Sequence, residues 1–242
     1  MRPIELLADR RGLAILVDPA RTSAGAARAL AERASAARVA LLLLGNSFGD
    51  DGDARAVARA LKAGAPQIPL LQFPGTAAQL VPDVDGVLLL SLVSGRNPQY
   101  LIEEHVRAVP FFARHPHVGS ISTAYCLVDG GRVTSVESVS QTRPLPADKP
   151  ELVAAHVRAA MLIGMRAVYL EAGSGAPVPV APELVAAARA ATDGLLFVGG
   201  GIRDAAAVRA ARDAGADYVV VGTQFEHDGG RLVQDLASAA LA

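Results

Sequence analysis

Short apolar runs alternate with alanine-rich helical patterns along the whole chain. The apolar runs are almost continuous, which is typical of strands buried on both faces of a parallel sheet. We predict eight strands, at Leu13–Asp18, Val39–Leu44, Pro69–Phe73, Val87–Ser91, Val118–Val128, Ala167–Glu171, Leu195–Gly199 and Tyr218–Gly222. The helical patterns between and after them are Ser23–Ala34, Asp53–Lys62, Pro98–Arg114, Pro150–Met165, Pro182–Ala191, Asp204–Ala214 and Gly230–Leu241.

This order of strands and helices predicts an α/β fold, a (β/α)8 TIM barrel. The connection Gly75–Val81 is brief and weakly helical, so we expect the third helix to be short or missing. A doubly wound open sheet is the alternative topology. The 242 residues show no linker or internal repeat and match the usual length of one barrel, so residues 1–242 are expected to form a single domain.

Charge and composition give no sign of a nucleic-acid-binding, disulfide-bonded, secreted or membrane-spanning protein. The formal net charge is −1, which gives no electrostatic footprint for a nucleic acid. The single cysteine, Cys126, rules out an internal disulfide. The first residues carry no apolar leader, and the longest aliphatic runs, such as Val39–Leu44, are too short to cross a bilayer. We expect a cytoplasmic protein with no transmembrane segment, and peripheral contact with a membrane surface stays open.

Three successive predicted strands end in glycine-rich turns, at Glu171–Pro177, Gly199–Arg203 and Gly222–Thr223. Backbone N–H groups at such turns bind anions, and the loops after the seventh and eighth strands are the usual phosphate site of a TIM barrel. The turns therefore predict a phosphate site, and tight turns without a ligand are the alternative. The predicted ligands are Gly200, Gly201, Gly222 and Thr223.

Glu171 places a carboxylate at the end of the sixth predicted strand, where barrel enzymes carry their active sites. Beside a phosphate, this carboxylate can accept the proton of a hydroxyl. Tyr169 precedes it by two residues, so both side chains should lie on the same side of the strand. We predict that both are catalytic. The alternatives are a carboxylate paired with an arginine at the rim and a tyrosine that fills the barrel.

Asp18 and Ser47 follow the first and second predicted strands and offer oxygen ligands at the same end of the barrel. Mg²⁺ often takes one or two protein oxygens and completes its shell with water and substrate phosphates. We therefore predict that Asp18 and Ser47 bind Mg²⁺, and the alternative is that Asp18 caps the next helix. The run Asp50–Asp53 is interpreted as a solvated loop in which Asp53 caps a helix. His105 shares an apolar helical pattern and is interpreted as a packed or interface residue.

Taken in order, these residues resemble the geranylgeranylglyceryl phosphate synthase family, also called the PcrB-type glycerol-1-phosphate prenyltransferases. The resemblance extends over nearly the whole chain, and its most specific stretches are Ser94–Pro98, Tyr169–Gly175 and Gly199–Arg203. The stretches that resemble the larger bacterial and archaeal branch are Ile121–Tyr125, Asp129–Gly131 and Pro146–Pro150.

The resemblance implies Mg²⁺-dependent transfer of a prenyl group, in the first place geranylgeranyl, from a polyprenyl diphosphate to the terminal hydroxyl of sn-glycerol 1-phosphate. It assigns Mg²⁺ to Asp18 and Ser47, and the hydroxyl proton to Glu171. The residues that it assigns to substrate binding are Tyr169, Leu170, Glu171, Ala172, Gly173, Ser174, Gly175, Gly200, Gly201, Gly222 and Thr223. It also implies a homo-oligomer and an apolar groove for the prenyl chain, and the candidate groove residues are Val93, Leu101 and Phe112.

Three places depart from the family's pattern. Ala20 stands where a second aspartate is usual after Asp18, which puts metal or diphosphate affinity in question. Glu103 and Glu104 replace a small residue and a glutamine, and Ala124 replaces a glycine. Two other functions therefore stay open. One is a phosphosugar isomerase or lyase, which would need a second acid or base at the barrel mouth, and the other is a phosphate-binding barrel without catalysis.

Overall fold

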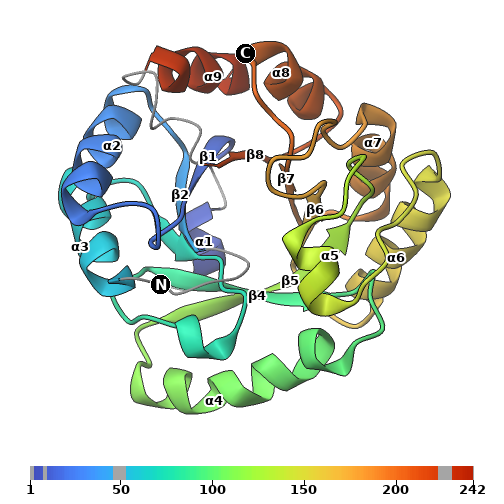
Figure 1. Cartoon of the computed structure of the whole chain (residues 1–242), viewed down its shortest axis with the longest axis horizontal. Coiled ribbons are helices and arrows are strands. Elements are labelled where there is room, and N and C mark those ends of the chain that lie inside the picture. The colour runs from blue at the N-terminus through green and yellow to red at the C-terminus, as the bar shows by residue number, and fades with distance from the viewer. Residues whose placement is uncertain (1–2, 8–9, 46–52, 223–230, 242) are drawn as a thin grey trace.

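The computed structural model describes residues 3–7, 10–45, 53–222 and 231–241, and over these residues eight parallel strands close into a barrel (Figure 1). Neighbours in the barrel are neighbours in the sequence, and the first strand pairs with the last. The strands are β1 (Gly12–Val17), β2 (Leu41–Leu44), β3 (Leu70–Gln72), β4 (Gly86–Leu92), β5 (Gly119–Leu127), β6 (Ala167–Glu171), β7 (Leu195–Gly199) and β8 (Tyr218–Val221). The predicted TIM barrel is confirmed, and the open sheet is wrong.

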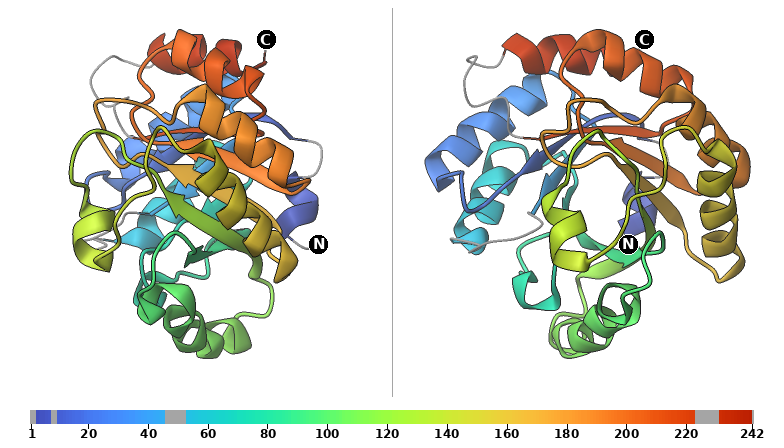
Figure 2. Two further views of the ribbon diagram at one scale, coloured as in Figure 1. Left: turned by 90° about the vertical axis from the view of Figure 1, so that its right-hand side faces the viewer. Right: turned by 45° about the vertical axis from the view of Figure 1, so that its right-hand side comes forward.

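Helices cover the outside of the barrel, as Figures 1 and 2 show. They are α2 (Ala24–Ala36), α3 (Ala54–Gly64), α4 (Glu104–Arg114), α6 (Pro150–Leu162), α7 (Pro182–Ala191), α8 (Ala205–Asp213) and α9 (Arg231–Leu241). Ser23, Asp53 and Asp204 cap three of them by accepting a backbone N–H, which confirms the role predicted for Asp53. Within the described residues, no helix is both long enough and apolar enough to span a membrane.

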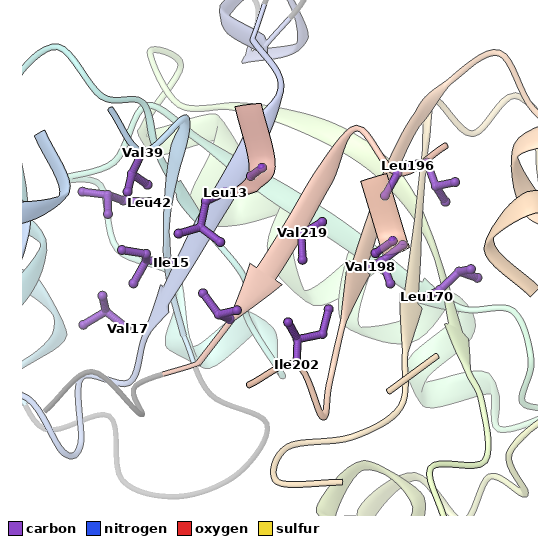
Figure 3. Packing of buried hydrophobic residues seen from close by; sticks show 14 of the residues in the cluster. Leu13, Ile15, Val17, Val39, Leu42, Leu170, Leu196, Val198, Ile202 and Val219 are labelled. Carbon is purple, nitrogen blue, oxygen red and sulfur yellow. The ribbon is translucent and has the colours of Figure 1, made fainter. Parts of the chain in front are cut away.

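Alternate residues of each strand face two different cores. On β1, Leu13 and Ile15 belong to the outer core, between the strands and the helices, and Figure 3 shows them near Val219 of β8. Ala14 belongs to the inner core, inside the barrel. Successive side chains of a strand point to opposite faces, so a strand buried on both faces needs apolar residues at every position. This is why the strands appear in the sequence as continuous apolar runs.

A short helix, α1 (Pro3–Leu7), closes the barrel at the N-terminal ends of the strands. Pro3 packs against the starts of β4 and β5, where a Cβ added at Gly86 or Gly119 would lie 2.5 or 2.4 Å from its ring. Leu7 is part of the inner core, and Figure 1 shows α1 within the ring of strands. The sequence analysis missed this helix. Because α1 forms a floor, the open end of the barrel is the one at which the strands finish.

The barrel is least regular around β4. The connection from β3 to β4 contains a short 3-10 helix, η1 (Ala77–Gln79), which confirms the shortened third helix. The helical pattern predicted at Pro98–Arg114 divides into a π-helical turn, η2 (Gln99–Glu103), and α4. After β5 comes α5 (Ser135–Ser140), which the sequence analysis did not predict. Val136 of α5 packs against the inner core, so α5 covers part of the barrel mouth.

Candidate active site

Glu171 ends β6 and is buried at the barrel mouth, with 7% of its surface exposed. Its Oε1 accepts a hydrogen bond of 2.6 Å from the backbone N–H of Gly173. The hydroxyl of Tyr169 donates a second hydrogen bond to the carboxylate. Burial outweighs both bonds and raises the pKa of Glu171 from 4.5 to about 7. A carboxylate that exchanges its proton near neutral pH is suited to general-base catalysis.

Tyr169 is held in place by the rings around it. Its ring centroid lies 4.9 Å from that of Phe73, 5.6 Å from Tyr125 and 6.0 Å from Phe197. Tyr125 and Phe197 occupy the paired positions on β5 and β7, so strand register creates this aromatic layer. Burial and the nearby Glu171 raise the pKa of Tyr169, so its hydroxyl keeps its proton and donates. Tyr169 therefore fixes the direction of the carboxylate.

The turn after β7 runs close against Glu171 and requires glycine. A Cβ at Gly199 would lie 2.5 Å from Oη of Tyr169, and a Cβ at Gly200 would lie 2.5 Å from Oε1 of Glu171. Gly200 also has a φ of 84°, which side-chain-bearing residues rarely adopt. The N–H of Ala172 donates to the carbonyl of Gly199 at 3.1 Å. The turns after β6 and β7 therefore form one continuous surface beside the carboxylate.

Two arginines flank the turn after β6. Nη2 of Arg132 donates to the carbonyl of Ser174 at 2.9 Å, and Nη2 of Arg203 donates to the carbonyl of Ala176 at 3.0 Å. Their positive charge makes this turn favourable for an anion. From the sequence, Arg203 was predicted only as part of the Gly199–Arg203 stretch, and Arg132 was not predicted. The available signal for Arg132 was its place directly after the two glycines that follow β5.

Most of the predicted substrate-binding residues lie together at the end of β6 and on the turns after β6 and β7. These residues are Tyr169, Glu171, Ala172, Gly173, Ser174, Gly175, Gly200 and Gly201. The side chain of Leu170 points into the outer core, as Figure 3 shows, so this residue can contact a substrate only through its main chain. Gly222 directly follows β8, and Thr223 lies outside the described residues.

Asp18 directly follows β1 at the same end of the barrel. Its Oδ1 accepts the N–H of Ala20 at 2.9 Å, and its Oδ2 lies 3.6 Å from Nε of Arg21. Ser47 lies outside the described residues, and those residues contain no group of three His, Cys, Asp or Glu side chains that could hold a metal. One carboxylate still fits Mg²⁺, which completes its shell with water and substrate phosphates. Binding of Mg²⁺ at Asp18 therefore stays a prediction.

An apolar pocket with about 740 Å³ of empty space, part of it open to solvent, lies on the side of the barrel formed by β4 and β5. Residues of β4, of the segment from β3 to η1, and of η2, α4 and α5 line it. Phe73 and Tyr125 both line the pocket and contact the ring of Tyr169. The pocket therefore ends against two rings that contact Tyr169, the residue that holds Glu171.

The three residues expected in a prenyl groove lie elsewhere. Val93 and Phe112 pack against the outer core, and neither they nor Leu101 are among the described residues that line the pocket. The π-helical turn η2 accounts for part of this difference. Its wider i→i+5 spacing rotates α4 relative to the regular helix that we expected to begin at Pro98.

His105 instead lines the pocket, together with Ala108. Nε2 of His105 lies 2.8 Å from the carbonyl oxygen of Leu90, which ties α4 to β4. Ile102 and Val109 stand three residues before and four residues after His105, at spacings that place residues on one face of a regular α-helix, yet they are 55% and 61% exposed. His105 is thus a packed residue, as interpreted, but on a different face from Ile102 and Val109.

The chain matches the model of the PcrB family over residues 9–240. A geranylgeranylglyceryl phosphate synthase from Zunongwangia profunda is 46% identical over 160 residues, which are 66% of this chain and 68% of that protein. A protein of the same name from Korarchaeum cryptofilum is 38% identical over 220 residues, which are 90% of this chain and 89% of that protein.

A solved structure is also similar over nearly its whole length. It is that of (S)-3-O-geranylgeranylglyceryl phosphate synthase from Thermoplasma acidophilum in complex with the substrate sn-glycerol-1-phosphate. The TM-score is 0.88 at 27% identity, and the match covers 98% of this chain and 96% of that chain.

Proposed function

Because the chain belongs to the PcrB family, we propose that it transfers a prenyl group from a polyprenyl diphosphate to the terminal hydroxyl of sn-glycerol 1-phosphate. The observation that carries this proposal is the position of Glu171. Its carboxylate, with a pKa of about 7, lies beside glycine turns suited to a phosphate, and Phe73 and Tyr125, which contact the ring of Tyr169, line an apolar pocket suited to a hydrocarbon chain. Prenyl transfer to a phosphorylated alcohol needs a base with these two neighbours.

In the proposed reaction, Glu171 accepts the proton of the attacking hydroxyl. As the hydroxyl oxygen bonds to the first carbon of the prenyl chain, the bond from that carbon to the diphosphate breaks, and its electron pair leaves with the diphosphate. The N–H of Gly173 and the hydroxyl of Tyr169 hold the carboxylate in one orientation. A base fixed in this way needs little reorganisation when the substrate arrives.

The phosphate of the acceptor is assigned to the turns at the ends of β6, β7 and β8. The glycines with positive φ on the first two turns are Gly173, Gly175, Gly200 and Gly201. Turns of this kind can direct backbone N–H groups toward an anion, and the two flanking guanidinium groups add positive charge. Binding there would place the glycerol hydroxyls beside Glu171.

The hydrocarbon chain of the donor is assigned to the apolar pocket. The pocket is lined mainly by apolar side chains and is open to solvent on one side, as a site for a hydrocarbon chain should be. We propose geranylgeranyl diphosphate as the donor, because relatives of this chain carry the name of geranylgeranylglyceryl phosphate synthase. Phe73 and Tyr125 would lie near the reacting end of that chain, because both contact the ring of Tyr169.

Asp18 is proposed to hold Mg²⁺ together with Ser47. When bound, Mg²⁺ supplies positive charge that neutralises the departing diphosphate. The carboxylate of Asp18 is a suitable oxygen ligand at the strand ends, and Arg21 adds a guanidinium 3.6 Å from it. A cytoplasmic location and a homo-oligomeric state also remain proposals, and light scattering on the purified protein tests the second.

A transfer assay tests the proposed function directly. The protein is incubated with Mg²⁺, radiolabelled sn-glycerol 1-phosphate and, separately, farnesyl, geranylgeranyl or heptaprenyl diphosphate, and the organic phase is counted. We expect a labelled lipid with the geranylgeranyl donor, and none with EDTA or with sn-glycerol 3-phosphate. Binding of sn-glycerol 1-phosphate without product from any donor would instead indicate a non-catalytic barrel. Turnover of a phosphosugar would indicate an isomerase or lyase.

A further inference from the structure

The carboxylate of Glu104 joins η1 to the start of α4, and both segments form part of one wall of the apolar pocket. Oε2 of Glu104, the first residue of α4, accepts the backbone N–H of Ala77 in η1 at 2.7 Å. The side chain of Glu104 is only 12% exposed, and both residues line the pocket. The bond therefore connects α4 to η1 across the edge of the pocket.

Three successive N–H groups at the start of η1, those of residues 75–77, differ in where their acceptors come from. Oε1 of Gln79 accepts the N–H groups of Gly75 and Thr76, at 2.6 and 3.2 Å, so the turn satisfies these two donors itself. The next N–H, that of Ala77, is satisfied by Glu104 of α4. Ala77 is half-buried, and a donor shielded from water that loses its acceptor is costly, so this wall depends on a residue from a separate element.

The α4 side of the junction is fixed from two directions. Oγ of Ser91 donates to the carbonyl of Leu101 at 3.0 Å, and this bond ties the π-helical turn to β4. The other carboxylate oxygen of Glu104 accepts from Nε2 of Gln99 at 3.2 Å and from Nη1 of Arg107 at 2.8 Å. Both oxygens of Glu104 are thus engaged, and its side chain is held where η1 meets α4.

We propose that Glu104 is a positioning residue that sets the width of the prenyl pocket by holding η1 against the start of α4. The inference rests on the proposed function, because it assumes that the pocket takes the prenyl chain. Glu104 does not touch the carboxylate of Glu171, so its effect should fall on donor binding and chain-length selectivity. The chemical step and the binding of glycerol phosphate should not change.

Three variants separate this role from a general effect of charge. Glu104→Ala removes the acceptor for the Ala77 N–H, whereas Glu104→Gln keeps a carbonyl oxygen in its place. Glu103→Ala is the matched control, because it removes a neighbouring glutamate that pairs with the same arginine, Arg107, at 3.7 Å but has a side chain 49% exposed. Each variant is tested by amide hydrogen exchange, by calorimetric binding of the unreactive geranylgeranyl thiolodiphosphate, and by steady-state kinetics.

For Glu104→Ala, we expect faster exchange at residues 75–80 and a donor KM and analogue Kd raised about tenfold, the loss typical of a charge-assisted hydrogen bond. The kcat and the KM for glycerol phosphate should stay within about twofold, and the preference for geranylgeranyl over heptaprenyl donor should weaken. Glu104→Gln keeps an acceptor for the Ala77 N–H but loses the charge and the second acceptor oxygen, so its values should fall between those of Glu104→Ala and the parent protein. If Glu104→Ala matches Glu103→Ala in exchange and analogue binding, the proposal is wrong. Absence of transfer by the parent would overturn the proposed function separately, because neither of these two measurements requires turnover.

Discussion

The two walls of the barrel mouth are built by different means. The regular side is formed by β6, β7 and the turns after them, and the irregular side is formed by η1 and the start of α4. At β6 and β7, strand register alone pairs Tyr169 with Phe197 and Glu171 with Gly199, so the backbone positions the base and the glycine turn. At η1 and α4, the pocket wall depends on side-chain bonds such as that from Glu104 to Ala77. For the proposed reaction, this difference predicts a fixed site for the small acceptor and, for the hydrocarbon chain, a wall that changing a single side chain would alter.

The largest effect is expected from Glu171→Gln, on the regular side. The amide keeps the shape of the side chain but cannot accept the hydroxyl proton, so kcat should fall at least about 100-fold. Calorimetry should give a Kd for sn-glycerol 1-phosphate within about threefold of the parent value, because the glycine turns remain. Glu183→Gln, on the exposed first turn of α7, is the control. Equal kcat values for Glu171→Gln and the parent would remove Glu171 from the chemical step.

Gly200→Ala should damage the same side through the backbone. The new Cβ would lie 2.5 Å from Oε1 of Glu171 and 2.6 Å from the N atom of Gly173, at a φ of 84°. We expect a loss of roughly 2–3 kcal/mol in the free energy of unfolding, measured by urea denaturation, together with a loss of activity. Gly25→Ala is the matched control, because nothing lies within 4 Å of its added Cβ. It should leave stability unchanged or raise it by about 0.5 kcal/mol.

A smaller and more selective effect is expected on the irregular side from Ala108→Phe. Ala108 is 2% exposed and lines the pocket, so a phenyl ring there should occupy part of the space assigned to the prenyl chain. We expect kcat/KM for geranylgeranyl diphosphate to fall about tenfold relative to farnesyl diphosphate, with an unchanged KM for glycerol phosphate. Ala113→Phe, at an exposed position of α4, should leave the ratio as it is. A uniform loss with both donors would argue against the pocket as the chain site.

The regular side was largely predictable from the sequence. The sixth and seventh strands were predicted with the bounds that the structure has, because their buried apolar runs end abruptly at Glu171 and Gly199. The alternation of a strand also placed Tyr169 and Glu171 on one face. The helix α5, in contrast, is short and carries mostly polar residues, so it gave no apolar period. Its available signal was the capping residue Thr134.

The pocket wall was not predictable in the same way. The bond between Glu104 and Ala77 joins residues 27 positions apart, and no local pattern marks such a pair. The π-helical turn η2 also changes which side chains of α4 face inward, so the 3.6-residue period, which groups His105 with Ile102 and Val109, does not separate the pocket residue from the two exposed ones. On this wall, a contact between distant segments and a local change of helical period were the features that the sequence pattern did not reveal.

The smallest predicted effect concerns the cost of burying Glu171. Its pKa rises from 4.5 to about 7 on burial, so the folded protein holds this proton more tightly than the unfolded chain does. The resulting stability is fully present below the unfolded pKa of 4.5 and is lost as the pH rises through about 7. Between about pH 6 and pH 8, the free energy of unfolding should fall about 1 kcal/mol more in the parent than in Glu171→Gln, which has no proton to lose. Urea denaturation at both pH values measures this difference, and an equal fall in the two proteins would mean that Glu171 is already ionised at pH 6. The base would then owe its reactivity to its position beside Tyr169 and Gly173 rather than to a raised pKa.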